Sequence, residues 1–277
     1  MDNIVYSDYS GNGVTETSFT NQSGTRLDTD EYPTRCVVDY DWDTFGKVTH
    51  TATHQSTYLR IYCTSTTTSN GFYLKWKDIS EVDYFQLQYS TDGISWSTLT
   101  PDDVWGYASS VASSIYPTST PDGTGQCLVL IDGSFVWKYI RVKFIDSSGY
   151  PADTDLAINW FIPVTRLNVH PPDASRSIQL ESNGINTEQS FDGNLWTTVF
   201  GAKPRVLPEL SWRDLDETEL TSFSLFRGHF KNNPHIILYT EELNNDDWYV
   251  CSWLGEDFTY SETAAGLYDT TLNLREL

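Results

Sequence analysis

Three aspartates at alternate positions, Asp39, Asp41 and Asp43, have the spacing most suggestive of chemistry. On a strand, alternate side chains point to one side, where these carboxylates could together attract a hard cation such as Ca²⁺. A solvated turn is the simpler interpretation, because no glycine follows at the spacing of an EF-hand loop. We therefore predict no metal site, and leave a bound Ca²⁺ at these acids as the open alternative.

Two histidines, His50 and His54, are four residues apart, a spacing that can hold a metal on a helix. The Thr-rich stretch around them favours a strand or loop, and no glutamate follows His50. The sequence also lacks a Gly-x-Ser-x-Gly motif, a Walker motif and a dinucleotide fingerprint. Acid pairs are so frequent that none stands out as a glycosidase pair. We predict neither an enzyme nor a bound cofactor.

The charge balance excludes some partners. The chain of 277 residues has 17 Lys and Arg against 38 Asp and Glu, a net charge of -21, spread over both halves. An acidic surface disfavours nucleic acid, whose binding needs Lys and Arg to replace counterions, and it disfavours an anionic membrane. We predict neither nucleic-acid binding nor membrane insertion.

Targeting segments and a disulfide framework are not predicted. There is no apolar run of about 18 residues, and no basic stretch followed by an apolar one at the amino terminus. The cysteines lack the paired spacing of zinc ligands. Free thiols in a reducing cytosol are expected for the four cysteines Cys36, Cys63, Cys127 and Cys251.

The composition, rich in Thr, Ser, Val, Tyr and Trp, predicts an all-β fold. The clearest element is a hairpin over residues 84–96. Phe85, Leu87 and Tyr89 alternate with polar residues, and Asp92-Gly93 is a typical two-residue turn. The return strand is expected to begin with Ile94, Trp96 and Leu99.

Further strands and boundaries follow from the same patterns. Residues 58–63 and 71–76 predict two strands joined by a Ser/Thr hairpin loop over residues 64–69. Residues 137–144 alternate between polar and apolar side chains. We predict a polar N-terminal arm, or loosely attached opening strands, at residues 1–30 and a proline-rich linker at residues 163–172.

Residues 173–277 predict a second β domain with one α-helix at about 216–230. Asp214 or Asp216 can cap this helix, and acids in its first turn suit the helix dipole. Leu220 and Phe223 continue an apolar face at helical spacing.

The hairpin carries a family resemblance. A strand that ends in Tyr89-Ser90, followed by Asp92-Gly93 and Trp96, resembles the discoidin, or galactose-binding-like, β-sandwich. Weaker matches at residues 38–45 and 139–144 extend the resemblance over about residues 30–162. Its early segment departs from the family pattern, because a glycine is missing and Phe45 replaces a tryptophan.

This resemblance implies a jelly-roll-like sandwich over residues 31–162 and glycan binding at loops on one end of it. The nearest positions in this sequence are Trp42 and Asp43 in one loop and Trp105 and Tyr107 in another. Since the chain has 10 tryptophans, core packing is the alternative for each of these aromatic side chains.

The second domain resembles tail-tip or distal-tail proteins of tailed bacteriophages in the order of its elements, over about residues 166–277. That order is a strand with Trp212, a helix ending in Phe, two short strands and a final Leu-x-Leu-x-Glu strand. The resemblance implies docking into a ring around a tail tube, and the residues then expected to serve assembly are Trp212, Phe223, Phe230 and Trp248.

Together these patterns predict a structural component of a bacteriophage virion, in the tail, tail tip, distal tail or baseplate. Its sandwich would decorate the particle or touch a host-surface glycan. The partners would be other tail proteins and further copies, as a ring, trimer or hexamer, assembled in the bacterial cytoplasm. The alternatives are a carbohydrate-binding module or adhesin, and an accessory domain of a glycan-degrading enzyme.

Overall fold

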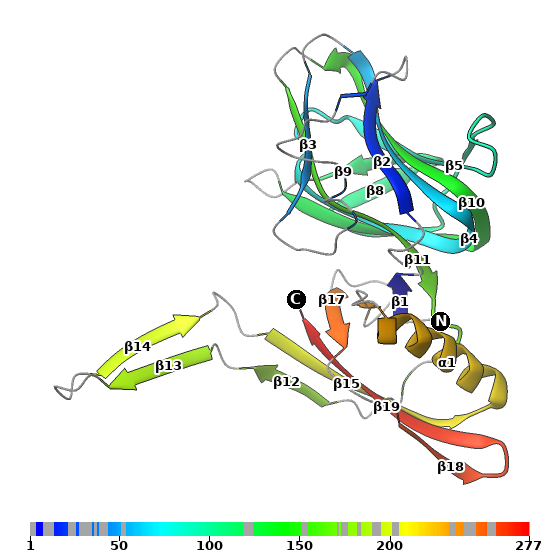
Figure 1. Cartoon of the computed structure of the whole chain (residues 1–277), viewed down its shortest axis with the longest axis vertical. Helices are drawn as coiled ribbons and strands as arrows, with labels where there is room; N and C mark the ends of the chain where they lie inside the picture. Colours follow the sequence, from blue (N-terminus) through cyan, green and yellow to red (C-terminus); the bar gives the residue numbers. More distant parts are fainter. Residues whose placement is uncertain are drawn as a thin grey trace. The chain divides into compact units, whose positions relative to one another are not determined.

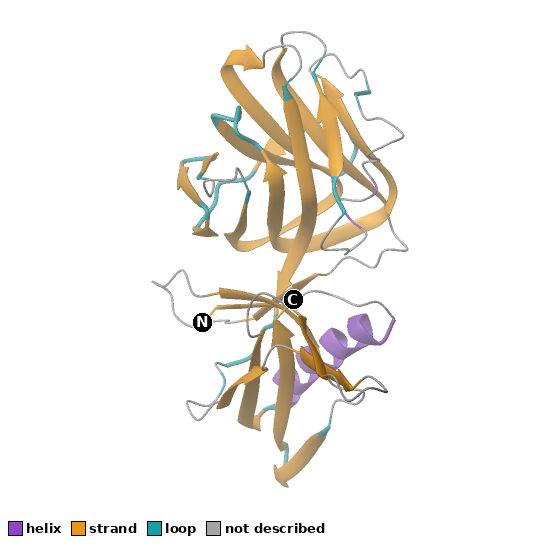
Figure 2. Ribbon diagram, turned by 90° about the vertical axis from the view of Figure 1, so that its left-hand side faces the viewer, coloured by secondary structure: helices purple, strands orange, loops and turns teal. Residues whose placement is uncertain are grey.

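A computed structural model of the chain divides into two units, which we describe separately. The N-terminal unit is Tyr6–Arg166, and the C-terminal unit is Met1–Val5 with Leu167–Leu277. In the described residues, strands predominate and one helix occurs (Figure 2). No helix among the described residues is long and apolar enough to cross a bilayer. The structure describes residues 4–7, 14–21, 26–27, 35, 38, 44–50, 54–118, 124–150, 154–170, 172, 177–181, 184–189, 195–200, 205–232, 237–240, 248–253 and 259–276.

The N-terminal unit is a β-sandwich of antiparallel strands, the all-β architecture predicted from the composition (Figure 1). The first eleven strands of the chain are β1 (Ile4–Ser7), β2 (Val14–Asn21), β3 (Gly46–Thr49), β4 (His54–Asp78), β5 (Tyr84–Ser90), β6 (Ser97–Thr98), β7 (Asp103–Gly106), β8 (Ala108–Val111), β9 (Ser114–Pro117), β10 (Gly125–Tyr150) and β11 (Asp155–Arg166).

Two long strands, β4 and β10, belong to both sheets of the sandwich. They pair antiparallel from Trp76↔Gly125 to His54↔Tyr150. The first half of β4 and the second half of β10 lie between β2 and β5 in the first sheet. The other halves lie between β11 and β7 in the second sheet, and β3 extends that sheet beyond β11.

The predicted hairpin loop at residues 64–69 is wrong. These residues lie where β4 crosses from the first sheet to the second. These residues continue β4, because Thr is β-branched and fits an extended strand. The register shifts between Leu130 and Phe135, next to Gly133, whose φ of 81° suits a bulge. Trp137 is fully buried at the crossing and donates its Nε1–H to Ser69 Oγ at 3.0 Å.

The core lies between the two sheets and confirms the predicted alternation. In β10, Ile140, Val142 and Phe144 are buried, as are Phe85 and Leu87 in β5. The polar and aromatic residues between them point away from the core, because successive side chains of a strand alternate. We call this solvent side of the first sheet the outer face.

Two predicted boundaries need correction. Residues 14–21, expected in an N-terminal arm or in loosely attached opening strands, form the strand β2, which pairs with β4 and buries Phe19 completely. Their Ser and Thr residues look polar but have strand propensity. Pro163, expected in the linker, lies within β11 opposite Phe72. A proline fits a strand wherever the hydrogen-bond ladder does not need its missing N–H.

The C-terminal unit combines short strands with the predicted helix. Its central pairings are β12 with β15, β15 with β19, and β19 with β17 and β18 (Figure 1). The helix contacts β15 and β19. Its elements are β12 (Ser177–Glu181), β13 (Gly184–Gln189), β14 (Leu195–Phe200), β15 (Arg205–Leu215), α1 (Glu217–Asn232), β16 (Ile237–Thr240), β17 (Trp248–Trp253), β18 (Tyr260–Ala264) and β19 (Leu267–Glu276).

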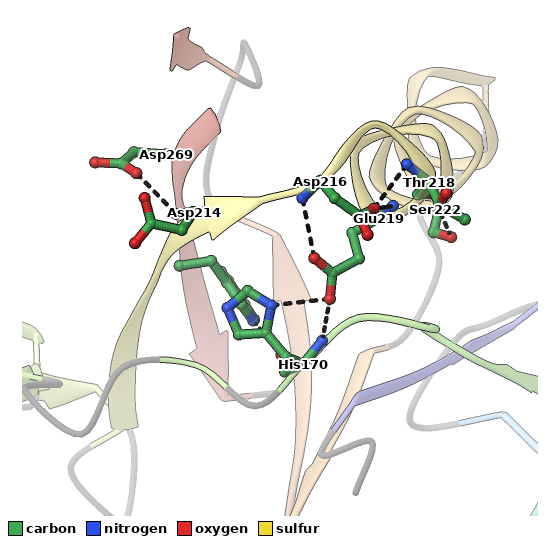
Figure 3. Close-up of polar contacts among 8 residues, drawn as sticks. His170, Asp214, Asp216, Thr218, Glu219, Ser222 and Asp269 are labelled. Carbon is green, nitrogen blue, oxygen red and sulfur yellow. Dashed lines mark hydrogen bonds and ion pairs between the residues drawn. The ribbon is translucent and has the colours of Figure 1, made fainter. Parts of the chain in front are cut away.

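Asp216 caps α1, as one of the two predicted alternatives (Figure 3). Its Oδ1 accepts hydrogen bonds from the backbone N–H groups of Thr218 and Glu219, each at 2.8 Å. In return, Glu219 Oε2 accepts the N–H of Asp216 at 3.1 Å. This reciprocal pair is a capping box, which satisfies the free donors at the start of a helix.

Replacing this cap is expected to destabilise the C-terminal unit. Asp216→Ala leaves two backbone N–H groups without their side-chain acceptor and should lower the free energy of unfolding by about 1 kcal/mol. Urea denaturation of the full chain measures the loss. The matched control is Thr218→Ala, an exposed residue whose side chain takes no part in the capping box. Equal stability of the two variants would contradict the capping role.

Candidate functional site

The turn after β5 folds back against the outer face. The predicted two-residue turn is wrong, because β6 begins only at Ser97, opposite Tyr89. Between the strands, Asp92 Oδ1 accepts the backbone N–H groups of Ile94 and Ser95 and the hydroxyl of Ser90, each at 2.8 Å. An aspartate can hold such a wider turn in place of a tight hairpin.

Hydrogen bonding also sets the charge of this turn. The backbone N–H of Ile94, then that of Ser95, and the Ser90 hydroxyl stabilise the carboxylate and lower the pKa of Asp92 from 3.8 to about 2. These three donors form their hydrogen bonds with the ionised carboxylate of Asp92. The turn therefore remains hydrogen-bonded at any pH well above 2.

This shift predicts an acid-labile turn. A lowered pKa in the folded chain adds stability that is complete above the unfolded value of about 4 and is lost as the pH falls toward about 2. Carboxyl ¹³C NMR should show Asp92 titrating near pH 2. Titration near pH 4 would contradict the hydrogen-bonded turn, and Asp92→Asn, which cannot titrate, assigns the signal.

The outer face in front of this turn carries aromatic and cationic side chains in register. Arg60 of β4 lies opposite Arg141 of β10, and Tyr62 lies opposite Tyr139. Their neighbours Ile61 and Ile140 enter the core. Two adjacent strands therefore present one row of guanidinium groups and one row of phenol rings on the same face.

The rings and cations of this face are stacked. The rings of Tyr62 and Tyr139 lie 4.6 Å apart at 17°. The guanidinium of Arg141 lies 3.8 Å from the ring centre of Trp96 and 4.6 Å from that of Tyr58, and its Nε donates to Gln88 Oε1 at 2.7 Å. Burial is the main cause that lowers the pKa of Arg141 to about 10, so it stays protonated at neutral pH. Cation–π contacts thus hold Trp96 over the sheet.

A cavity of about 320 Å³ opens between the turn and the outer face, within the size range of small-molecule sites. The polar groups of its described wall are hydroxyl and guanidinium groups and an indole N–H, which suit hydrogen bonding to a ligand. We call it the Trp96 pocket, and its wall consists of Ser18, Arg60, Ile61, Tyr62, Gly93, Trp96 and Tyr139.

Glycine is required in one part of this wall. Gly93 has a φ of +75°, and a Cβ there would lie 3.2 Å from the ring of Tyr139. The left-handed backbone and the close approach both favour glycine over larger residues. The turn therefore lies directly on the ring of Tyr139, which lines the pocket.

The predicted ligand residues lie elsewhere or outside the described residues. Trp42 and Asp43 fall outside the described residues. Trp105 is half-buried in β7 opposite Leu128, and Tyr107, just after β7, is 44% exposed. Neither side chain is in the wall of the Trp96 pocket. A ligand role for these four residues stays a prediction.

Sequence reasoning missed the pocket residues because it assigned Trp96 to the return strand of a tight hairpin. The usable signal was the alternation of residues 137–144, which correctly puts Tyr139 and Arg141 on the solvent side. Aromatic side chains on a solvent-facing strand add to exposed apolar surface, which can mark a binding site.

Of the residues considered as metal ligands, for which no metal site is predicted, His50 has a structural role. His50 is fully buried, and its Nδ1 and Nε2 lie 3.0 Å from the Thr154 carbonyl oxygen and 2.6 Å from Thr57 Oγ1. The side chain of His54 and residues 39, 41 and 43 lie outside the described part of the structure. Within that part, no group of three or more His, Cys, Asp or Glu side chains is placed to hold a metal ion.

The predicted assembly residues lie in the C-terminal unit. Trp212 and Phe223 are almost completely buried and pack edge to face at 4.9 Å. The side chains of Phe230 and Trp248 lie outside the described part. The assembly role stays a prediction.

A polar tether holds His170 beside the start of α1 (Figure 3). The backbone N–H of His170 donates to Glu219 Oε1 at 2.8 Å, and its ring Nδ1 lies at the same distance from this oxygen. The indole N–H of Trp212 donates to the His170 carbonyl at 2.9 Å. Burial raises the pKa of Glu219, but the N–H groups of His170 and Asp216 outweigh it and leave the pKa lowered. The contacts indicate a structural anchor.

Comparisons with known proteins show that this chain resembles solved structures in fold class only. No protein-family model matches the sequence, and no curated protein matches it. Several solved structures that are similar to the chain are carbohydrate-binding modules. The likeness to tail proteins has no counterpart among the structures named below.

Three of these structures illustrate the likeness. The CBM32-1 and CBM32-2 domains of ZmpB from Clostridium perfringens are 8% identical, cover 98% of this chain and 89% of that chain, and have a TM-score of 0.41. A CBM32-1 from a family 31 glycoside hydrolase of the same organism is 14% identical (55% and 96% covered, TM-score 0.38). A pectin binding carbohydrate binding module is 16% identical (54% and 89% covered, TM-score 0.36). At these TM-scores the likeness carries no argument about what this chain binds.

Proposed function

We propose that this protein is a non-catalytic carbohydrate-binding protein whose sugar site is the Trp96 pocket. The observation that carries the proposal is the wall of that pocket, which combines three aromatic rings with hydroxyl and guanidinium donors around a cavity of about 320 Å³. Sugars have apolar C–H faces that pack on aromatic rings and a rim of hydroxyl groups that need polar partners.

The rigidity of the wall supports the proposal. Trp96 is held by Arg141, Tyr139 is stacked on Tyr62, and the turn is fixed by Asp92. A preformed site spends less binding free energy on ordering its side chains. The polar and aromatic groups are therefore already arranged before the ligand arrives.

A glycan array probed with the full chain tests the proposal. We expect selective retention on a subset of glycans, and we expect it to survive in Trp105→Ala and Tyr107→Ala variants, whose side chains lie outside the pocket. Loss of binding in these two variants would move the sugar site to the predicted loop. Retention on no glycan at all would overturn the proposal.

The tail-assembly role predicted for residues 173–277 is a separate hypothesis with its own test. Light scattering over a concentration series gives the absolute mass of the full chain. A trimer or hexamer would support assembly, and a monomer of 31.5 kDa at every concentration would count against a self-assembling ring.

A further inference from the structure

The Trp96 pocket has a cationic wall. Arg60 is the charged residue among those that line it. The other lining side chains are hydroxyl, aromatic or aliphatic groups. Within the wall, Arg60 is therefore the residue that would interact electrostatically with a charged group of a ligand.

Arg60 is incompletely partnered. Its Nε is buried and has no hydrogen-bond partner in the described part of the chain. No described carboxylate forms an ion pair with it, although the chain has 38 acidic residues. A buried donor without an acceptor is costly, so the described protein groups leave the hydrogen-bonding capacity of Arg60 only partly used.

Other cations surround the pocket. Arg141 lies opposite Arg60 in the sheet. The amino group of Lys138 is 5.4 Å from the ring centre of Tyr62, and that of Lys143 is 6.0 Å from the ring centre of Tyr58. These cations outnumber the ionised carboxylate of Asp92 in the adjoining turn, on a chain whose net charge is -21.

We propose that the ligand of the Trp96 pocket is an acidic sugar, whose carboxylate or sulfate group accepts hydrogen bonds from the guanidinium of Arg60. This inference rests on the proposed carbohydrate-binding function and narrows it to anionic saccharides. A guanidinium matches both anions, because its parallel N–H groups can bind two oxygens at once. Arg141, held between two rings, acts as a positioning residue for Trp96.

Matched pairs of sugars test the charge requirement by calorimetry on the full chain. The pairs are an oligogalacturonate and its methyl ester, sialyllactose and lactose, and sulfated and unsulfated lactose. We expect the acidic member of at least one pair to bind about tenfold or more tightly than its neutral counterpart. Which pair shows the difference distinguishes a carboxylate from a sulfate ligand.

Variants of Arg60 assign the effect to one side chain. Arg60→Gln should abolish the preference for the acidic sugar, and Arg60→Lys should restore part of it. The control Lys77→Gln removes one positive charge from the far end of the same strand, outside the pocket, and should leave the preference unchanged. Thermal melts show whether each variant is folded.

The two proposals fail in different ways. Equal affinity for the acidic and neutral members of every pair would overturn the acidic-sugar inference and leave carbohydrate binding in place. An acidic preference that survives in a folded Arg60→Gln variant would also overturn the inference. Failure of every sugar to bind would overturn both.

Discussion

Replacement of Trp96 by alanine is expected to weaken sugar binding at least about tenfold, because truncating a tryptophan at the centre of a site typically costs about 2 kcal/mol or more. The indole forms one wall of the pocket and also packs 3.8 Å from the guanidinium of Arg141. Its loss therefore removes a stacking surface and loosens a neighbouring cation. Isothermal titration calorimetry with the best glycan from the array measures the change.

The same turn offers a matched control. Ile94 is 85% exposed and lies outside the pocket wall, so Ile94→Ala should bind the glycan as the unmodified chain does. Trp96→Phe keeps a flat ring and should retain intermediate affinity. Equal affinities of Trp96→Ala and Ile94→Ala would show that the indole does not contact the sugar.

A methyl group at Gly71 is expected to lower the free energy of unfolding by about 3 kcal/mol, at the upper end of the usual cost of overpacking. Gly71 lies opposite Leu130 in the long β4–β10 pair. An added Cβ would overlap the carbonyl oxygen of Val129 and contact the side chain of Leu130. Because the first obstacle is backbone, two strands must move apart to make room.

Urea denaturation of Gly71→Ala measures this loss. The control is Gly228→Ala in α1, where the added Cβ meets no atom within 4 Å. Alanine at this helical position should raise stability by up to about 1 kcal/mol. A Gly71→Ala variant as stable as the unmodified chain would contradict the close approach of the two strands.

The sequence correctly predicted those strands and helix ends that depend only on residues close together in the chain. The alternation in residues 84–90 and 137–144 placed Phe85, Leu87 and Ile140 in the core correctly. The acids before residue 217 predicted the helix start, which the cap at Asp216 confirms. In these segments, side-chain period and capping chemistry depend on neighbours a few residues apart.

Long-range pairing could not be deduced in the same way. The Ser/Thr run at residues 64–69 and Pro163 are turn or linker signals by themselves, yet both lie in strands whose partners are distant in sequence. Tertiary context decides strand formation more strongly than local propensity. The firm attachment of β2 to β4 was missed for the same reason.

The candidate site was the least predictable feature. Arg60, Trp96 and Tyr139 meet only because β4 and β10 pair and the Asp92 turn folds back onto them. Aromatic spacing alone does not distinguish a binding side chain from a core one. Trp212 illustrates the same ambiguity, because a tryptophan expected at an assembly surface is buried against Phe223.

The most direct test of a sugar site at the Trp96 pocket is ¹⁹F NMR of the full chain labelled with 5-fluorotryptophan. The chain has 10 tryptophans, and Trp96→Phe and Trp105→Phe variants assign the two signals of interest. We predict that titration with the bound glycan shifts the Trp96 signal and leaves the Trp105 signal in place. A shift of Trp105 without a shift of Trp96 would contradict the account and place the sugar at the loop.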